Sequence, residues 1–163
     1  MRINFFEATC KEPPLKNELF GLCDNQNGTK AYTDIDNHVN WIATVKNDNK
    51  IELTFTAIDK CVIKDDEEKG RGRCDGMLTS SEHIYFIELK EVNPPWITGA
   101  IEQLESTIRF FTENHDINAY RHKKAFACNK QRSHFQEMDN EFNLRFFRKY
   151  KVRIDVQGEI III

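Results

Sequence analysis

Residues 74–91, CDGMLTSSEHIYFIELKE, decide the fold. Arg73 to Thr79 and His83 to Lys90 are short segments rich in β-prone residues, and Ser80-Ser81-Glu82 between them forms a turn signal. Two such segments joined by a tight turn predict an antiparallel hairpin. Asn93-Pro94-Pro95 follows, and because proline cannot donate to a ladder we expect the second strand to end before it.

Three charged residues lie where this hairpin would be expected to bury hydrocarbon. Asp75 is near the start of the first strand, and Glu88 and Lys90 are near the end of the second. Asp75 and Glu88 can be neighbours across the ladder, while Glu88 and Lys90 are two positions apart and point to the same side. Two close carboxylates repel each other unless a cation lies between them. A hard divalent ion such as Mg²⁺, or Mn²⁺ in its place, meets that need.

The same residues suggest a division of roles around a metal. Asp75 and Glu88 would be its carboxylate ligands, and the backbone carbonyl of Leu89 could add an oxygen. Lys90 would orient or deprotonate the attacking water, or stabilise charge building on a phosphate. The alternative is a surface hairpin with a Glu–Lys pair, which contributes roughly a few tenths of a kcal/mol.

The rest of the chain predicts helices and strands around the hairpin. Ile97 to His115 has apolar residues at three- and four-residue steps and predicts an amphipathic helix. Two further helices are expected at Leu15 to Cys23, after a proline pair, and at 35–45. The remaining expected elements are one or two strands in 51–63, a strand at 124–128, a helix at 135–142, and a final strand or strand pair at 146–156.

This order predicts the α/β class, with a central mixed β-sheet flanked by helices. We expect a single domain over 1–163, because no Pro/Gly/Ser-rich linker or repeat divides the chain. Within it, 51–128 would be the core, 1–50 a helical N-terminal elaboration, and 129–163 a helix with C-terminal strands. The β-prone end GEIIII would be the last strand of the sheet or an assembly strand, which leaves a homodimer open.

Composition narrows the protein class. With 40% hydrophobic and 30% charged residues among 163, the chain has the composition of a soluble globular protein. No apolar run approaches the roughly 20 residues of a membrane span, and no secretory signal is evident, so no membrane partner is expected. Five cysteines without a CxxC pair predict free thiols, which favours a cytoplasmic location.

Charge is unevenly placed along the chain. The formal net charge is −3, but residues 119–153 hold ten Lys or Arg and three Asp or Glu, a local charge of +7. A local positive field favours a polyanion such as nucleic acid, and Lys130 and Arg132 are candidate phosphate contacts. A solvated charged face is the competing interpretation.

The pattern of Asp75, Glu88 and Lys90 resembles the PD-(D/E)xK nuclease superfamily over roughly residues 51–128. The resemblance implies an αβββαβ, restriction-endonuclease-like core and metal-dependent hydrolysis of phosphodiester bonds, with DNA as the expected substrate. It also implies that Gln103 faces the site and that an acid from the first helix, here Glu18, completes it. Cys74 departs from the usual proline, and Thr107 stands where one branch has a tyrosine.

Two other interpretations remain open. A non-catalytic binding, immunity or regulatory protein could retain the nuclease-like fold, although a dead site has no reason to keep Asp75, Glu88 and Lys90 together. The three residues could also be an accident in an unrelated α/β domain. The expected enzyme is a Mg²⁺-dependent endonuclease.

Overall fold

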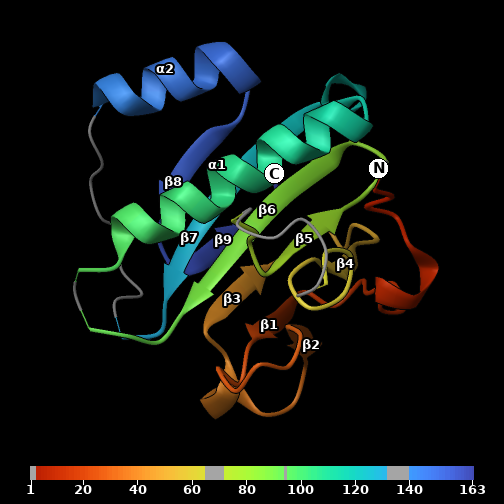
Figure 1. The fold of residues 1–163 in the computed structure, drawn as a ribbon. Coiled ribbons are helices and arrows are strands. Elements are labelled where there is room, and N and C mark those ends of the chain that lie inside the picture. Colours follow the sequence, from red (N-terminus) through yellow and green to blue (C-terminus); the bar gives the residue numbers. More distant parts are fainter. Residues whose placement is uncertain (1–2, 65–71, 94, 132–139) are drawn as a thin grey trace.

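The computed structural model describes residues 3–64, 72–93, 95–131 and 140–163. Within these ranges the chain is α/β, with two mixed β-sheets and two α-helices (Figure 1). The four-stranded sheet has the order β2 (Tyr32–Asp34), β1 (Leu19–Cys23), β3 (Ala43–Lys46), β9 (Glu159–Ile161). The five-stranded sheet has the order β4 (Thr54–Ala57), β5 (Gly76–Thr79), β6 (His83–Lys90), β7 (His122–Asn129), β8 (Arg153–Val156). The helices are α1 (Ile97–Asn114) and α2 (Asn140–Tyr150), and short 3₁₀ helices lie at Ala8–Cys10, His38–Asn40 and Ile117–Ala119.

The predicted hairpin is confirmed. β5 and β6 pair antiparallel, from Gly76 opposite Ile87 to Thr79 opposite Ile84. The Ser80 amide donates to the His83 carbonyl at 3.0 Å, which closes the turn. β6 has the predicted bounds, and seven of its eight residues are buried. It is therefore a central strand covered on both faces.

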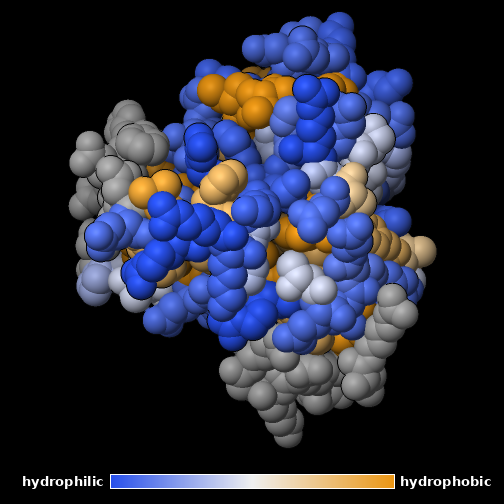
Figure 2. Space-filling view, turned by 90° about the horizontal axis from the view of Figure 1, so that it is seen from above, coloured by the Kyte–Doolittle hydropathy of each residue, from blue (hydrophilic) through white to orange (hydrophobic). Residues whose placement is uncertain are grey.

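Both faces of β6 are covered because the molecule has three layers. Ile84 and Phe86 belong to the hydrophobic cluster that α1 completes. Tyr85 and Ile87 belong to a second cluster, between the two sheets. The layers are therefore α1, the five-stranded sheet and the four-stranded sheet, and α1 crosses one face of the five-stranded sheet in Figure 1. Seen from above, the outer surface is mostly hydrophilic, with separate hydrophobic patches (Figure 2).

The helix α1 connects two parallel strands. β6 and β7 pair in parallel register from His83 opposite His122 to Lys90 opposite Asn129. The predicted helix and the predicted strand at 124–128 are both confirmed. A β–α–β crossover needs a dozen or more residues, and α1 supplies them while covering the sheet. The two strands begin and end at the same levels, so each end of β7 lies beside the matching end of β6.

The helices expected in the first fifty residues are wrong. Residues 15–23 end in strand β1, and 35–45 contain a 3₁₀ turn and most of β3. Ile35 is 46% exposed and Val39 is 71% exposed, so their helical spacing does not mark a buried face. Gly21 lies directly against the indole ring of Trp41, with no room for a Cβ. The N-terminal elaboration is therefore a β-sheet held on the core by apolar packing.

The C-terminal predictions are partly wrong. Most of the helix expected at 135–142 lies outside the described residues, and α2 occupies the first part of the strand expected at 146–156. Only Arg153–Val156 forms strand β8. GEIIII contributes β9, which pairs in parallel with β3 in the four-stranded sheet and buries Ile160 and Ile162.

The expectation of five free thiols is wrong for two cysteines. Cys10 and Cys61 form a disulfide between residues 51 positions apart, with a Cα–Cα distance of 5.7 Å. Cys23, Cys74 and Cys128 are free and buried. The bond ties the N-terminal segment to the turn after β4. It went unpredicted because pairing at this separation depends on how the chain folds.

Candidate functional site

Asp75 and Glu88 are brought together by the register of the hairpin. Asp75 directly precedes β5, one position before Gly76, which pairs with Ile87, so Asp75 lies opposite Glu88. The Asp75 amide donates to the Ile87 carbonyl at 3.0 Å, and its carboxylate Oδ2 accepts from the Leu89 amide at 2.6 Å. Asp75 is 8% exposed and Glu88 is 3% exposed. Two acids thus share a nearly dry position at one end of the sheet.

Lys90 forms an ion pair with one of the two acids, Glu88. Its Nζ lies 3.0 Å from Glu88 Oε2, and its side chain is 29% exposed. The other carboxylate oxygen of Glu88, Oε1, is buried and accepts no hydrogen bond. A buried oxygen without a donor costs free energy, so it marks a place where a proton or a cation would be stabilising.

The surroundings shift the pKa values of all three groups. Burial raises the pKa of Glu88 to about 7, although the Lys90 charge works against this shift. Burial, with the charge of Glu88 added, raises the pKa of Asp75 well above its ordinary value. Burial alone would lower the pKa of Lys90, but the charges of Glu88 and Asp75 outweigh it and the pKa is raised. Near neutral pH the acid pair therefore retains a proton unless a cation replaces it.

Asp24 is a third acid at this place, and no sequence pattern pointed to it. It follows β1, and its Oδ1 accepts from the Gln26 amide at 3.0 Å. After burial and Glu88, its carboxylate is a further cause of the raised pKa of Asp75. The signal is an acid directly after a strand, and it could be recognised only once residues 19–23 were known to be β rather than helix.

The oxygen atoms available at this site suit a hard divalent cation as ligands. Glu88 offers its unpartnered Oε1, and the Leu89 carbonyl points to the Asp75 side, because the N–H and C=O of one strand residue face the same neighbour. Gln26 Nε2 donates to that carbonyl at 3.5 Å, which leaves a lone pair. Among the described residues no group of three or more His, Cys, Asp or Glu is arranged to hold a metal. Two carboxylates and a carbonyl, with water and phosphate completing the shell, suit Mg²⁺.

Gln103 does not contact the acids, but it hydrogen-bonds to the backbone just before Asp75. Its Oε1 accepts from the Arg73 amide at 2.7 Å. One turn later, Thr107 Oγ1 accepts from the Cys74 amide at 2.7 Å and donates to the Gln103 carbonyl at 2.9 Å. α1 therefore holds residues 73 and 74 in place. Thr107 is part of that support, although in the sequence it was noted only as the position where one branch has a tyrosine.

Three other expected site residues are not brought to the acids. Glu18 is exposed, pairs with Lys50 at 3.3 Å, and lies at the opposite end of β1 from Asp24. Lys130 lies at the same end of the sheet as Lys90, but its Nζ donates to the Val39 carbonyl at 2.6 Å and pairs with Glu91 at 3.7 Å. Arg132 lies outside the described residues.

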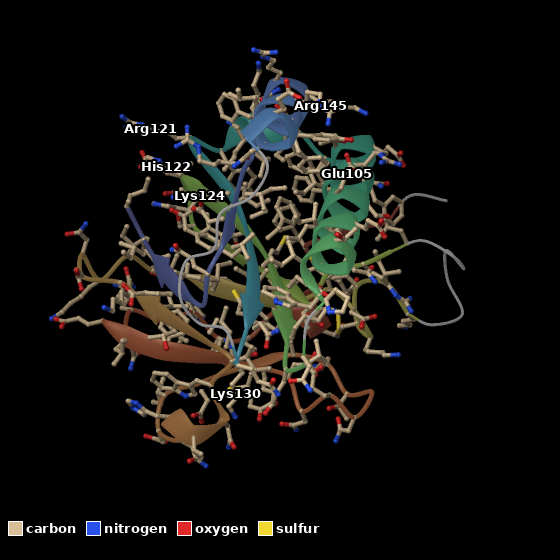
Figure 3. The ribbon with its side chains drawn as sticks, turned by 90° about the vertical axis from the view of Figure 1, so that its left-hand side faces the viewer. Glu105, Arg121, His122, Lys124, Lys130 and Arg145 are labelled. Carbon is tan, nitrogen blue, oxygen red and sulfur yellow. A yellow bond between two sulfur atoms is a disulfide. The ribbon has the colours of Figure 1, made fainter. Side chains whose placement is uncertain are left out.

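The basic residues of 119–153 are not gathered in one place, because some lie at the start of β7 and others beyond its end. Arg121, His122 and Lys124 gather at the start of the strand, whereas Lys130 follows its end (Figure 3). Most of the positive charge counted in the sequence is thus distant from Asp75 and Glu88.

An open pocket of about 410 Å³ adjoins Lys90. Gln26 lines it from the loop after β1, and Trp96, Thr98 and Gly99 line it from the start of α1. The pocket gives a substrate access to the Lys90 ammonium from solvent.

Comparisons with protein-family models, with curated proteins and with solved structures found no match to this chain. In the part of the chain that the structure describes, no helix combines the length and apolar character that crossing a membrane requires.

Proposed function

We propose that this chain is a metal-dependent nuclease that hydrolyses phosphodiester bonds of nucleic acid, with DNA as its substrate. The observation that carries the proposal is the pairing of Asp75 with Glu88 across the hairpin, with Lys90 Nζ 3.0 Å from Glu88 and with Glu88 Oε1 buried and unpartnered. A site built only for stability would not place two acids together in a buried position and leave an oxygen of Glu88 without a donor.

The roles follow from the donor set. Asp75 and Glu88, with the Leu89 carbonyl, would hold Mg²⁺ or Mn²⁺. When bound, the metal would lower the pKa of water and neutralise charge on the phosphate. Lys90, which lines the open pocket, would orient the attacking water and stabilise the negative charge that develops on the phosphate oxygens. The new P–O bond forms from this water as the bond to the leaving oxygen breaks.

The order of elements supports a restriction-endonuclease-like core. β4, β5, β6, α1 and β7 follow in the order βββαβ, and the acids lie at the β5–β6 positions that the superfamily motif implies. Among the described residues before β4 there are only two short 3₁₀ helices in place of the first helix of the αβββαβ pattern, and strands of the four-stranded sheet pack there instead. We propose that Asp24, from this sheet, takes the place of the acid expected from that helix.

A non-catalytic binding protein with this fold is the second candidate. Two observations favour it: Lys90 pairs with Glu88, and the described residues hold no group of three His, Cys, Asp or Glu arranged for a metal. In such a protein the acids and Lys90 would form a closed network with no need for a cation. The two candidate functions differ in whether a divalent metal binds at the acid pair.

Cleavage of supercoiled plasmid in Mg²⁺ or Mn²⁺ tests the proposal. Wild type should convert supercoiled plasmid to nicked and linear forms, EDTA should stop the reaction, and Lys90→Ala should lose at least about 100-fold in rate. Lys16→Ala, a matched change at an exposed lysine of the N-terminal segment, should cut like wild type. A result with neither metal binding nor cleavage of DNA or RNA would favour the binding protein.

A further inference from the structure

A second charged surface lies at the other end of the five-stranded sheet. We call it the basic pocket: an open hollow of about 370 Å³ lined by Arg121, His122, Lys123, Lys124, Lys151 and Arg153 around the ring of Phe147. Arg121, His122 and Lys124 gather there in Figure 3, while Arg145 lies elsewhere, on α2. The pocket is not part of the site formed by Asp75 and Glu88.

Three segments that are distant in sequence build the basic pocket. The start of β7 supplies the cations of residues 121–124, the turn after α2 supplies Lys151, and β8 begins with Arg153. Lys124 lies opposite Arg153 in the parallel β7–β8 pair, so their positions are fixed by the ladder. The positive charges therefore stand on a rigid frame.

Phe147 is an exposed aromatic ring among these cations. Its residue is 40% exposed. Lys151 Nζ lies 6.0 Å from the ring centroid, and Arg153 Cζ lies 5.9 Å from it. A partly exposed ring in contact with two cations combines a surface on which a base can stack with positive charge for the phosphates beside that base.

Acids compensate only part of the positive charge. Asp155 pairs with Lys124 at 3.4 Å, and the Lys123 ammonium donates to the Tyr120 carbonyl at 2.8 Å. Within the described ranges, Arg121, Lys151 and Arg153 have no acidic partner. Like charges held close together are unfavourable without an anion, so the arrangement favours a phosphate-bearing ligand.

The backbone conformation of Lys151 fixes where its side chain begins, as it does at Lys50 and Lys60 elsewhere in the chain. Its φ is 61°, in the left-handed region that usually holds Gly or Asn after a helix. Its amide donates to the Phe147 carbonyl at 2.7 Å, which ends α2. A lysine in this conformation carries a cost that glycine would avoid, and here it places a cation beside Phe147.

The basic pocket and the acid pair lie at opposite ends of the sheet. β6 and β7 run side by side over seven residue steps, which is roughly 23 Å. Ala125 and Ala127 of β7 face α1, so the alternating Lys124 faces away from it, whereas Glu88 alternates with Phe86 on the α1 side. One bound phosphate cannot contact both places.

We propose that the basic pocket binds single-stranded nucleic acid, with a base against Phe147 and the neighbouring phosphates against Arg121, Lys151 and Arg153. Exposed aromatic rings combined with a positive groove are the means by which proteins bind single strands without reading sequence. This goes beyond the proposed nuclease function, since it needs neither metal nor cleavage and would hold for a protein that cuts nothing.

Fluorescence anisotropy with labelled oligo-dT in EDTA tests the proposal. Phe147→Leu keeps the apolar bulk and removes the aromatic face, and should weaken oligo-dT binding about tenfold. The double variant Lys151→Glu/Arg153→Glu should weaken it more and should flatten the dependence of log K on log salt. Arg145→Glu reverses one charge on α2, outside the basic pocket, and should bind within about twofold of wild type, whereas Lys151→Glu, a single reversal inside the pocket, should bind clearly more weakly.

The controls decide between this pocket and general attraction to positive charge. Circular dichroism and Tm must show that each variant is folded. An equal loss in Arg145→Glu would overturn the proposal in favour of diffuse electrostatic binding. Binding of the matching duplex as tightly as of oligo-dT, with no effect of Phe147→Leu, would also overturn it, because a site that contacts only phosphates would be indicated. If the wild-type protein binds oligo-dT but does not cleave plasmid, the result would count against the proposed nuclease function and not against single-strand binding.

Discussion

Asp75 and Glu88 face each other across the β5–β6 hairpin, at 8% and 3% exposure, and the Lys90 ammonium lies 3.0 Å from Glu88 Oε2. Burial makes the charged form of both acids unfavourable, and the charge of Glu88 makes ionisation of Asp75 harder still. The pair is therefore a strained element of the folded protein in the absence of a cation. The first two predictions follow from this relationship.

Without metal, the acid pair should make the protein less stable as the pH rises from 5 to 8. The pKa of Glu88 is about 7 in the fold against an ordinary value of 4.5, so over this window the unfolded chain releases a proton that the folded chain keeps. A raised pKa of this kind contributes stability at low pH that is lost through the folded pKa. In EDTA, Glu88→Gln should gain about 5 °C in Tm relative to wild type between pH 5 and pH 8. Glu102→Gln, at an exposed acid of α1, should show no such trend, and a wild-type advantage that grows with pH would contradict the account.

Divalent cation should reverse that loss. At pH 8, Mn²⁺ at about 100 times its Kd should raise the Tm of wild type by roughly 5–10 °C, because the ion binds the folded state and neutralises the acid pair. Asp75→Asn removes one ligand charge and should abolish the increase, while being at least as stable as wild type in EDTA. Asp48→Asn, at an exposed acid, is the matched control and should respond to Mn²⁺ like wild type. An equal Mn²⁺ response in Asp75→Asn would place the ion elsewhere.

Thr107 should act on the site through the backbone before Asp75. Thr107→Val preserves shape but leaves the buried Cys74 amide without its acceptor, which should cost about 1–3 kcal/mol in the free energy of unfolding. Thr107→Ser keeps the hydroxyl and should lose much less. If this support positions Asp75, Thr107→Val should also weaken Mn²⁺ binding measured by calorimetry on folded protein. Equal stability of the Val and Ser variants would show that the hydrogen bond contributes little.

The Cys10–Cys61 disulfide should contribute strongly to stability. A bond that closes a loop of 51 residues restricts the unfolded chain by an amount equivalent to about 4 kcal/mol, or about 10 °C in Tm for a protein of this size. Dithiothreitol should therefore lower the Tm of wild type by that order. The double variant Cys10→Ala/Cys61→Ala should start from the lower Tm and show no further change with dithiothreitol. An unchanged wild-type Tm would mean that the bond is absent or unimportant.

The elements predicted correctly are those whose pattern is enforced by local burial. α1 buries Ala100, Leu104, Ile108 and Phe111 along one face, so its periodicity appears directly in the sequence. The hairpin was readable because turn residues separate two β-prone runs, and its register then placed Asp75 beside Glu88. The candidate site could be predicted to this extent because it lies within one hairpin.

The parts that were missed depend on contacts between distant segments. Residues 15–23 were expected to form a helix because a proline pair precedes them, whereas Gly21 packing under Trp41 and the pairing of β1 with β2 and β3 select the strand. Asp24 reaches the acids because of that sheet. The positive charge of 119–153 was expected to favour a polyanion, and five of its ten basic residues line the basic pocket, at the end of the sheet away from the acids. A sum of charge along the chain carries no information about which end of a strand holds it.

The most direct test of the central claim is the anomalous difference density of a crystal grown with Mn²⁺ at pH 8. The account predicts a single strong peak between the carboxylates of Asp75 and Glu88, about 2.1 Å from an oxygen of each, with the Leu89 carbonyl or water completing the shell. Absence of a peak there, with both carboxyl groups bonded to each other and to Lys90 as in a closed network, would contradict it.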